Sequence, residues 1–258
     1  LYIYLIMSVP KIIFIVPYRD RKEHLQLFKS HMSELLEDYS KDTYKILFIH
    51  QCDERSFNRG CMKNIGFKFV KDNYPTTYQN ITLVFNDVDT YPRTKDLINY
   101  ETTEGNIKHF FGFKYALGGI VSIKAKDFEK MNGFPNLWAW GYEDNALQQR
   151  ALESKLNIDR SQFFLGKDEN IIQIKDGPVR VVNKIEFEKY MKKINDGIHS
   201  ITNLEYIYDE KSGFVNVNNF HIPHSHANHY DKQYDLRNGL APFSRGRRNP
   251  LMNMPYIG

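Results

Sequence analysis

The first half of this chain alternates short apolar runs with longer amphipathic stretches, and this order limits the fold more than any other feature. Lys11–Val16, Lys45–Ile49 and Ile81–Phe85 are rich in β-branched and aromatic residues, which is typical of strands buried on both faces. Residues 21–39 and 58–73 separate them and carry apolar side chains at helical spacing. A strand–helix–strand–helix–strand order predicts a parallel sheet with right-handed crossovers. We therefore expect an α/β fold.

Length and composition indicate one large globular domain. The chain has 258 residues, of which 41% are hydrophobic and 26% are charged, as in ordinary soluble proteins. Its formal net charge is only +4, which does not indicate nucleic acid as a partner but suits a mildly basic cleft for a phosphorylated ligand. No apolar stretch of the sequence approaches the roughly 20 residues of a membrane span.

The N-terminus leaves the compartment open. Leu1–Met7 is apolar but short, and it lacks the layout of a signal peptide. Met7 as the natural start would make a cytoplasmic chain. A trimmed catalytic domain would instead belong in the Golgi or another secretory lumen.

The two cysteines are few enough to exclude a disulfide scaffold. Cys52 and Cys61 lie nine residues apart. We expect a buried pair of free thiols, with one disulfide as the alternative.

Polar clusters follow each of the three expected strands. Pro17–Arg21 follows the first strand, Gln51–Asp53 and Phe57–Gly60 follow the second, and Asn86–Asp89 follows the third. The carboxyl ends of parallel strands meet at one edge of the sheet, where ligands bind in such folds. Arginines next to a carboxylate-bound cation make a suitable diphosphate site. That edge would gather Arg19, Arg21, Arg59, Asp87 and Asp89.

Asp87-Val88-Asp89 is the candidate cation site. On an extended segment two residues at this spacing point to the same side, so both carboxylates could address one cation or a ribose. Oxygen ligands suit Mg²⁺ or Mn²⁺, which would bridge to phosphates. The alternative is a solvated turn, since this triplet is common by chance.

The segment Trp138–Asn145 holds both tryptophans of the chain, followed by Glu143 and Asp144. An indole offers a broad apolar face and one donor, which suits stacking on a sugar ring. The carboxylates could take a proton from a sugar hydroxyl. The alternative is a core aromatic cluster next to a helix N-terminus, where acids are favoured.

Taken together, these motifs resemble the β-1,4-galactosyltransferase family. They occur in the family's order over about residues 9 to 155, and Asp196–Ile201 extends the likeness. The resemblance implies a GT-A fold, with a mixed, mainly parallel sheet flanked by helices. It also implies an inverting, metal-dependent enzyme that moves a hexose from a UDP-sugar to a hydroxyl of a sugar acceptor. The matching motifs are Val16–Arg21, Phe57–Gly60, Phe85–Asp89, Gly118-Gly119, Asn132–Pro135 and Trp138–Asp144.

The resemblance also implies roles for single residues. Asp144 would be the general base, with Glu143 beside it, and Asp89 would bind Mn²⁺ or Mg²⁺. Acceptor-binding residues would be Gly141, Tyr142, Glu143 and Asp144. Donor-binding residues would be Pro17, Tyr18, Arg19, Arg21, Phe57, Arg59, Asp87, Val88, Asp89, Gly119 and Trp140.

Three departures from the family pattern concern specificity. The usual Tyr-Phe-Gly-Gly reads Ala116–Gly119 here. In the family that tyrosine helps restrict the donor, so Ala116 would leave room for an N-acetyl sugar such as N-acetylgalactosamine in place of galactose. Tyr142 replaces a small residue and Asn145 replaces an acid, which concerns the acceptor.

The sequence offers two sets of candidates for the remaining metal ligands. The family has a metal-binding His about thirty residues after the acidic motif, but here residues 146–198 contain none and Ile171–Asp176 occupies roughly that place. Four histidines gather instead in His221–His229, and His224 and His226 have a spacing that suits a metal. We expect them to join Asp89 at the cation. A His-rich surface segment, with acids or water completing the shell, is the alternative.

The motifs predict a catalytic domain over residues 7–230 and a polar, basic tail over 231–258 that includes Ser244–Asn249. Two other functions share some of these features. A UDP-sugar- or glycan-binding module that has lost catalysis would fit the missing histidine. A nucleotidyltransferase would share the sheet and the acids, but it would not need the tryptophan motif.

Overall fold

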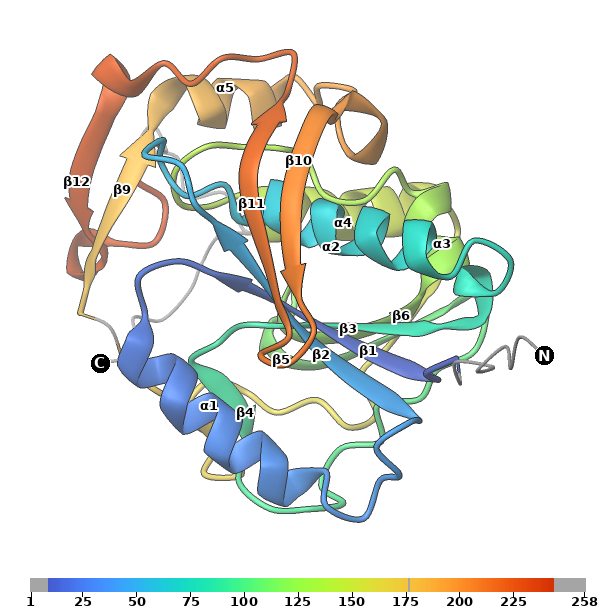
Figure 1. The fold of residues 1–258 in the computed structure, drawn as a ribbon. Coiled ribbons are helices and arrows are strands. Elements are labelled where there is room, and N and C mark those ends of the chain that lie inside the picture. Colours follow the sequence, from blue (N-terminus) through green and yellow to red (C-terminus); the bar gives the residue numbers. More distant parts are fainter. Residues whose placement is uncertain (1–8, 176, 244–258) are drawn as a thin grey trace.

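The computed structural model describes residues 9–175 and 177–243. Its centre is an eight-stranded sheet with the strand order β10-β11-β2-β1-β3-β6-β5-β7. Helix α1 covers one face, and α2, α3 and α4 lie on the other (Figure 1). The strands are β1 Ile12–Tyr18, β2 Tyr44–Gln51, β3 Thr82–Asn86, β4 Thr90–Pro92, β5 Asn106–Phe113, β6 Ala116–Lys124, β7 Asn157–Asp159, β8 Ile171–Gln173, β9 Val179–Asn183, β10 Thr202–Asp209, β11 Phe214–His221 and β12 Asp231–Asp235. The helices are α1 Lys22–Leu35, α2 Arg59–Asn73, α3 Ala125–Lys130, α4 Glu143–Glu153 and α5 Lys184–Met191.

The predicted parallel centre is confirmed. Strand β1 pairs in parallel with β2 and with β3, and β11 adds to β2 in parallel. Strand β6 pairs antiparallel with β3, so the sheet is mixed and mainly parallel at its centre, as expected. The strand ends that carry the polar clusters therefore lie on one edge.

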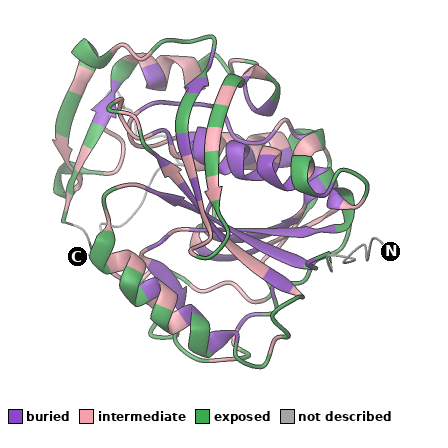
Figure 2. Cartoon of the chain, in the orientation of Figure 1, coloured by how far each residue is buried: buried purple, intermediate pink, exposed green. Residues whose placement is uncertain are grey.

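Strand β1 separates two hydrophobic cores, and its seven residues are all buried. Ile13 and Ile15 belong to the core under α2, whereas Ile12, Phe14 and Val16 belong to the core under α1. This follows from the alternation of side chains along a strand. Figure 2 shows the buried strands between partly exposed helices.

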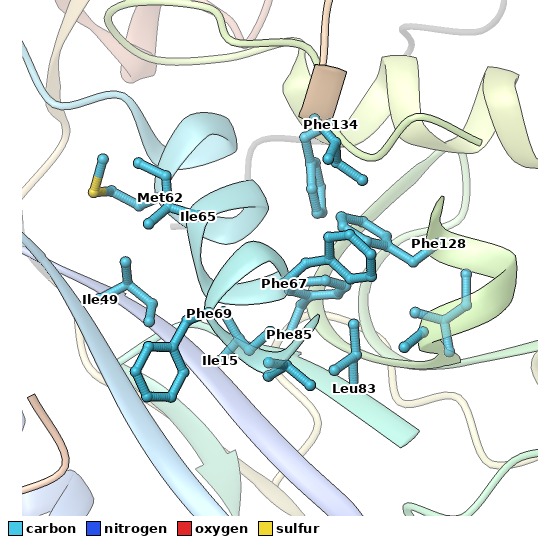
Figure 3. Close-up of a cluster of buried hydrophobic side chains, with 14 of the residues drawn as sticks. Ile15, Ile49, Met62, Ile65, Phe67, Phe69, Leu83, Phe85, Phe128 and Phe134 are labelled. Atoms are coloured by element: carbon cyan, nitrogen blue, oxygen red, sulfur yellow. The ribbon is translucent and has the colours of Figure 1, made fainter. Parts of the chain in front are cut away.

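The core under α2 is dense because that helix approaches the sheet closely (Figure 3). A Cβ added at Gly66 would lie 2.6 Å from the Ile15 side chain, so only glycine permits this approach. Rings from several elements fill the space beside it, and Phe85 packs at 4.6 Å from Phe128 and 5.2 Å from Phe134 between ring centroids. The rigid α2 fixes where its first residues lie.

The chain continues beyond residue 230 as part of the fold. Strand β12 pairs antiparallel with β9 over five residues. Further on, the Phe243 ring stacks on Phe187 of α5, with 5.6 Å between centroids. The predicted basic stretch Ser244–Asn249 lies outside the described residues.

Two smaller expectations are also tested. Both cysteines are free, but only Cys61 is buried. The expected buried pair is therefore wrong for Cys52, which follows the last residue of β2 and is exposed. In the part of the chain that the structure describes, no helix is both long and apolar enough to cross a membrane.

Candidate active site

The two acids that follow β3 lie in a tight turn. The Thr90 amide donates to the Asp87 carbonyl at 3.1 Å, and the Asp87 amide donates to the Gly119 carbonyl of β6 at 3.1 Å. The extended segment expected here is therefore wrong, because the chain turns at residues 87–90 between β3 and β4. The two carboxylates still influence each other. Burial raises the pKa of Asp89, and the charge of Asp87 raises it further.

Arg59 connects these acids to those of α4. It is the first residue of α2, whose N-terminus is capped by the Asn58 side chain. Its Nη2 donates to both carboxylate oxygens of Asp87, at 3.0 and 3.1 Å. Its Nε lies 3.6 Å from Glu143 Oε1, and Nη2 lies 3.9 Å from Asp144 Oδ2. Burial alone would lower the pKa of Arg59, but the surrounding carboxylates raise it above its usual value.

Glu143 and Asp144 form the first turn of α4. Tyr142 precedes them with a φ of +74°, and this sharp turn places both acids beside Arg59. Burial raises the pKa of Glu143, opposed by Arg59 and reinforced by Asp144. A Cβ at Gly118 would lie 2.3 Å from Asp144 Oδ2. The Gly118 position in β6 is therefore needed to make room for the Asp144 carboxylate.

Lys63 belongs to this cluster and was missed by the sequence argument. Its Nζ donates to Asp144 Oδ1 at 3.1 Å, and its side chain is only 2% exposed. The signal was its position four residues after Arg59, which places both on the same side of α2.

A cavity opens beside the acids of α4. Phe113 and Tyr115 form one side as a stacked pair, with ring centroids 5.5 Å apart and planes inclined by 12°. Trp140 lines the cavity and donates from its backbone amide to the Val181 carbonyl of β9 at 2.8 Å. The full lining is Arg59, Phe113, Tyr115, Ala116, Trp140, Gly141, Tyr142, Glu143, Asp144, Asn145, Leu240 and Ala241. We call this the acid cavity.

Trp138 does not line the acid cavity. It is 1% exposed and stacks between Phe220 and His226, at 5.8 and 5.2 Å between centroids. Its Nε1 donates to the His224 carbonyl at 3.2 Å, and its amide donates to Glu186 Oε2 at 3.0 Å. Sugar stacking is therefore a wrong interpretation for Trp138, and the core-cluster alternative holds for it.

His224 and His226 line a second cavity, which we call the histidine cavity. It measures about 600 Å³ and is also lined by Arg55 and Trp138. His226 Nε2 lies 3.0 Å from Asp231 Oδ2. Among the described residues, no three His, Cys, Asp or Glu side chains are arranged as a metal site. The structure therefore does not bring His224 and His226 together with Asp89 as a ligand group.

The other predicted donor residues lie around the same sheet edge. Tyr18 packs its ring on His50 and Phe214. Arg19 donates to the Arg55 carbonyl, and Arg21 acts electrostatically on Asp87 and Asp89. The remaining residues are Pro17 at the end of β1, Phe57 against the core under α2, and Val88 in the core under α1.

Comparisons with known proteins agree with this geometry. Residues 6–102 match the N-terminal region of glycosyl transferase group 7, and residues 106–174 match the N-terminal domain of galactosyltransferase. Xylosylprotein 4-β-galactosyltransferase of Caenorhabditis elegans is 30% identical over 220 residues, which cover 79% of this chain and 73% of that protein. This chain belongs to the β-1,4-galactosyltransferase family.

Other members of the family are similar over comparable lengths. Human β-1,4-galactosyltransferase 6 is 29% identical over 74% of this chain, but the match spans only 52% of the human protein. The crystal structure of the catalytic domain of Drosophila β1,4-galactosyltransferase 7, in complex with xylobiose, has a TM-score of 0.64 at 22% identity. It covers 86% of this chain and 98% of the Drosophila chain. The fold is thus that of a GT-A glycosyltransferase.

Each of the two matched regions contains part of the site. Arg59, Asp87 and Asp89 lie in the first matched region, and Glu143 and Asp144 lie in the second. The histidine cavity and the part of the acid cavity formed by residues 240 and 241 draw on segments beyond residue 174. This β-1,4-galactosyltransferase family member therefore builds part of its acid cavity from its own C-terminal segment.

Proposed function

We propose that this chain transfers a hexose, galactose or N-acetylgalactosamine, from a UDP-sugar to a hydroxyl of a sugar acceptor, with inversion at the transferred carbon. The observation that carries the proposal is the convergence of Asp144, Glu143 and Arg59 at a cavity lined by aromatic rings. Membership in a family of enzymes named galactosyltransferases supports it. The aromatic faces suit sugar rings, and the acids suit proton removal.

The donor side would use the residues at the strand ends. Arg59 and Arg21 supply positive charge for the diphosphate, and Arg59 is held in place by its two bonds to Asp87. The Drosophila relative has been solved as a mutant with manganese, UDP-Gal and xylobiose. We propose that this chain likewise binds manganese and a UDP-sugar.

Asp89 fits the metal better than the histidines do. Burial and the neighbouring Asp87 make its ionised form unfavourable, and a bound cation would offset both effects. A carboxylate oxygen is a ligand that Mn²⁺ and Mg²⁺ accept. When bound, the ion would neutralise charge on the departing diphosphate. Asp89 would hold it, with diphosphate oxygens and water completing the shell.

Asp144 would take the proton from the acceptor hydroxyl. It is the less buried of the two acids, with a side chain 20% exposed against 5% for Glu143. Attack of the hydroxyl oxygen on the side opposite the diphosphate forms the new glycosidic bond and inverts the carbon. Glu143, whose pKa is raised by burial, would help orient the acceptor through hydrogen bonds.

The wall of the acid cavity bears on which sugars enter. Ala116 is small and lines the cavity, which would leave space for an N-acetyl group on the donor. Leu240 and Ala241 close another part of the wall. We propose that they contact the acceptor opposite the Phe113 and Tyr115 rings.

A UDP-release assay over a panel of UDP-sugars and sugar acceptors tests this function. With Mn²⁺, one UDP-sugar should give UDP release that rises with an acceptor and stops with EDTA. The preferred donor would show whether Ala116 admits an N-acetyl sugar. UDP–Mn²⁺ binding without turnover across the panel would favour a binding module that has lost catalysis. Release of pyrophosphate instead of UDP would indicate a nucleotidyltransferase.

A further inference from the structure

Lys63 is a charged side chain buried inside the cluster of proposed catalytic residues. It lies in the second turn of α2, and the lysine as a whole is 1% exposed. A lysine ammonium is almost never fully buried unless it is paired, because removing the charge from water is costly. The role of Lys63 should therefore follow from the group with which it pairs.

That partner is Asp144. Lys63 Nζ donates to Asp144 Oδ1 at 3.1 Å, and the two residues are 81 positions apart in the sequence. On its other side the ammonium lies 4.5 Å from the centre of the Phe134 ring, a favourable cation–π contact. Lys63 is thus held on two sides, and it in turn holds one oxygen of Asp144.

The two oxygens of Asp144 therefore differ. Oδ1 is bound to Lys63 at 3.1 Å, whereas Oδ2 lies 3.9 Å from Arg59 Nη2 and faces the space left by Gly118. Arg59 meanwhile keeps two close bonds to Asp87. Without Lys63, Asp144 could swing onto Arg59, which would occupy the oxygen needed for the acceptor.

We propose that Lys63 is a positioning residue for transfer. It fixes the Asp144 carboxylate through Oδ1 and leaves Oδ2 to accept the proton of the acceptor hydroxyl. The inference rests on the proposed role of Asp144 as the base. It acts through Asp144 and needs no contact between Lys63 and either sugar.

The test compares Lys63→Met with a matched control on the same helix. Met keeps a similar length without charge, so the packing of α2 is largely retained. Lys71 also forms a salt bridge, to Glu129 at 2.6 Å, but its side chain is 44% exposed. In Lys63→Met we expect kcat for transfer to fall by about 10²-fold, as for a misplaced catalytic group. The KM for the donor and the UDP–Mn²⁺ affinity should stay within about twofold of wild type, and Lys71→Met should leave kcat unchanged.

Three results separate positioning from a purely structural role. Combining Lys63→Met with Asp144→Asn should give no further loss beyond Asp144→Asn alone. Lys63→Arg, which can still donate to Asp144, should recover part of kcat, and it also serves if the Met variant does not fold. A Lys63→Met protein with wild-type kcat but lower stability would overturn the proposal.

A structural readout keeps the proposal separate from the enzyme's overall function. In a crystal structure of Lys63→Met, Asp144 should move to within about 3.2 Å of Arg59. An Asp144 that keeps its position would contradict the inference whether or not the protein is active. Conversely, a wild-type protein that turns over no donor would reject the proposed function, while the position of Asp144 in the variant would still decide what Lys63 holds.

Discussion

The acid cavity and the histidine cavity are both lined by residues of the short loop that precedes α4, but their polar side chains are paired differently. Trp140 lines the first and Trp138 lines the second. Beside the histidine cavity the polar groups satisfy one another, since Asp231 accepts from Asn183 and Ser56 and lies 3.0 Å from His226 Nε2. At the acid cavity four carboxylates surround Arg59, of which those of Glu143 and Asp144 line the cavity and those of Asp87 and Asp89 do not.

A binding site and a structural cluster thus differ in how completely their charged groups are paired. Glu186 shows the structural case, since it accepts from the Trp138 amide and from Lys189. Asn183 and Phe187 anchor the C-terminal segment, Asn183 by donating to Asp231 and Phe187 by stacking on Phe243. Around Asp89 and Glu143, by contrast, burial and a neighbouring carboxylate raise the pKa of each acid although Arg59 is close, and such acids in a cleft are candidates for ligand binding.

The largest effect should come from Asp144→Asn. Loss of a general base should lower kcat for transfer by roughly 10²–10⁴-fold, because the amide cannot take the acceptor proton. UDP–Mn²⁺ affinity, measured by calorimetry, should stay within about twofold of wild type. Asp72→Asn, an exposed acid of α2 outside both cavities, is the control. Equal losses of binding and transfer in Asp144→Asn would reject its role as the base.

The free energy of unfolding should depend on pH through His109, a residue of β5. This buried histidine donates from Nε2 to the Phe111 and Gly118 carbonyls, at 3.0 and 3.1 Å, and accepts from Arg160. Burial, and after it the charge of Arg160, lower its pKa from 6.5 to about 4. The unfolded chain therefore binds the proton first as the pH falls. Stability should be lost between pH 6.5 and about 4, by roughly 3 kcal/mol.

Urea unfolding at several pH values checks this effect. The comparison is between wild type and His109→Gln, because other acids titrate in both proteins and cancel. The variant should be less stable at pH 7 and should lack that part of the pH dependence. Parallel stability curves for the two proteins between pH 4 and 7 would show that His109 does not cause it.

The dependence of UDP binding on metal should change in an Asp89 variant and not in variants of the histidine cavity. Asp89→Ala should weaken UDP binding in Mn²⁺ on the order of tenfold and should make the remaining binding insensitive to EDTA. His224→Ala and His226→Ala should leave the Mn²⁺ dependence unchanged, since neither joins Asp89 in a ligand group among the described residues. Manganese titration of UDP binding measures all three. A loss in the His226 variant matching that in Asp89→Ala would restore the original histidine prediction.

The smallest effect should come from the C-terminal wall. Leu240→Ala widens the acid cavity at the segment anchored by β12 and Phe243. We expect the KM for a small acceptor to rise by a few-fold, about 1 kcal/mol, with kcat nearly unchanged. Leu152→Ala, an exposed leucine on α4, is the control. Unchanged acceptor KM values across a series of acceptor sizes would remove Leu240 from the acceptor site.

Much of the site could be predicted because it depends on strand ends. Arg59, Asp87 and Asp89 each follow or begin an element whose periodicity is plain in the sequence, and parallel strands bring such ends together. The turn at Asp87–Asp89 was missed because nothing in those residues indicates that the chain leaves the sheet after β3 and joins β8 through β4. Lys63 was missed because its partner is 81 residues away.

Local hydrophobic periodicity in the sequence specifies the first three strands, the two helices between them and the edge of the sheet where polar residues gather. Which polar residues line a cavity and which pair with each other depends instead on tertiary contacts. Trp138 and Trp140 show the reason, since they are two positions apart yet lie in different surroundings. Burial and pairing depend on distant segments, here β11, α5 and the C-terminal segment, whose approach to the loop is not encoded locally.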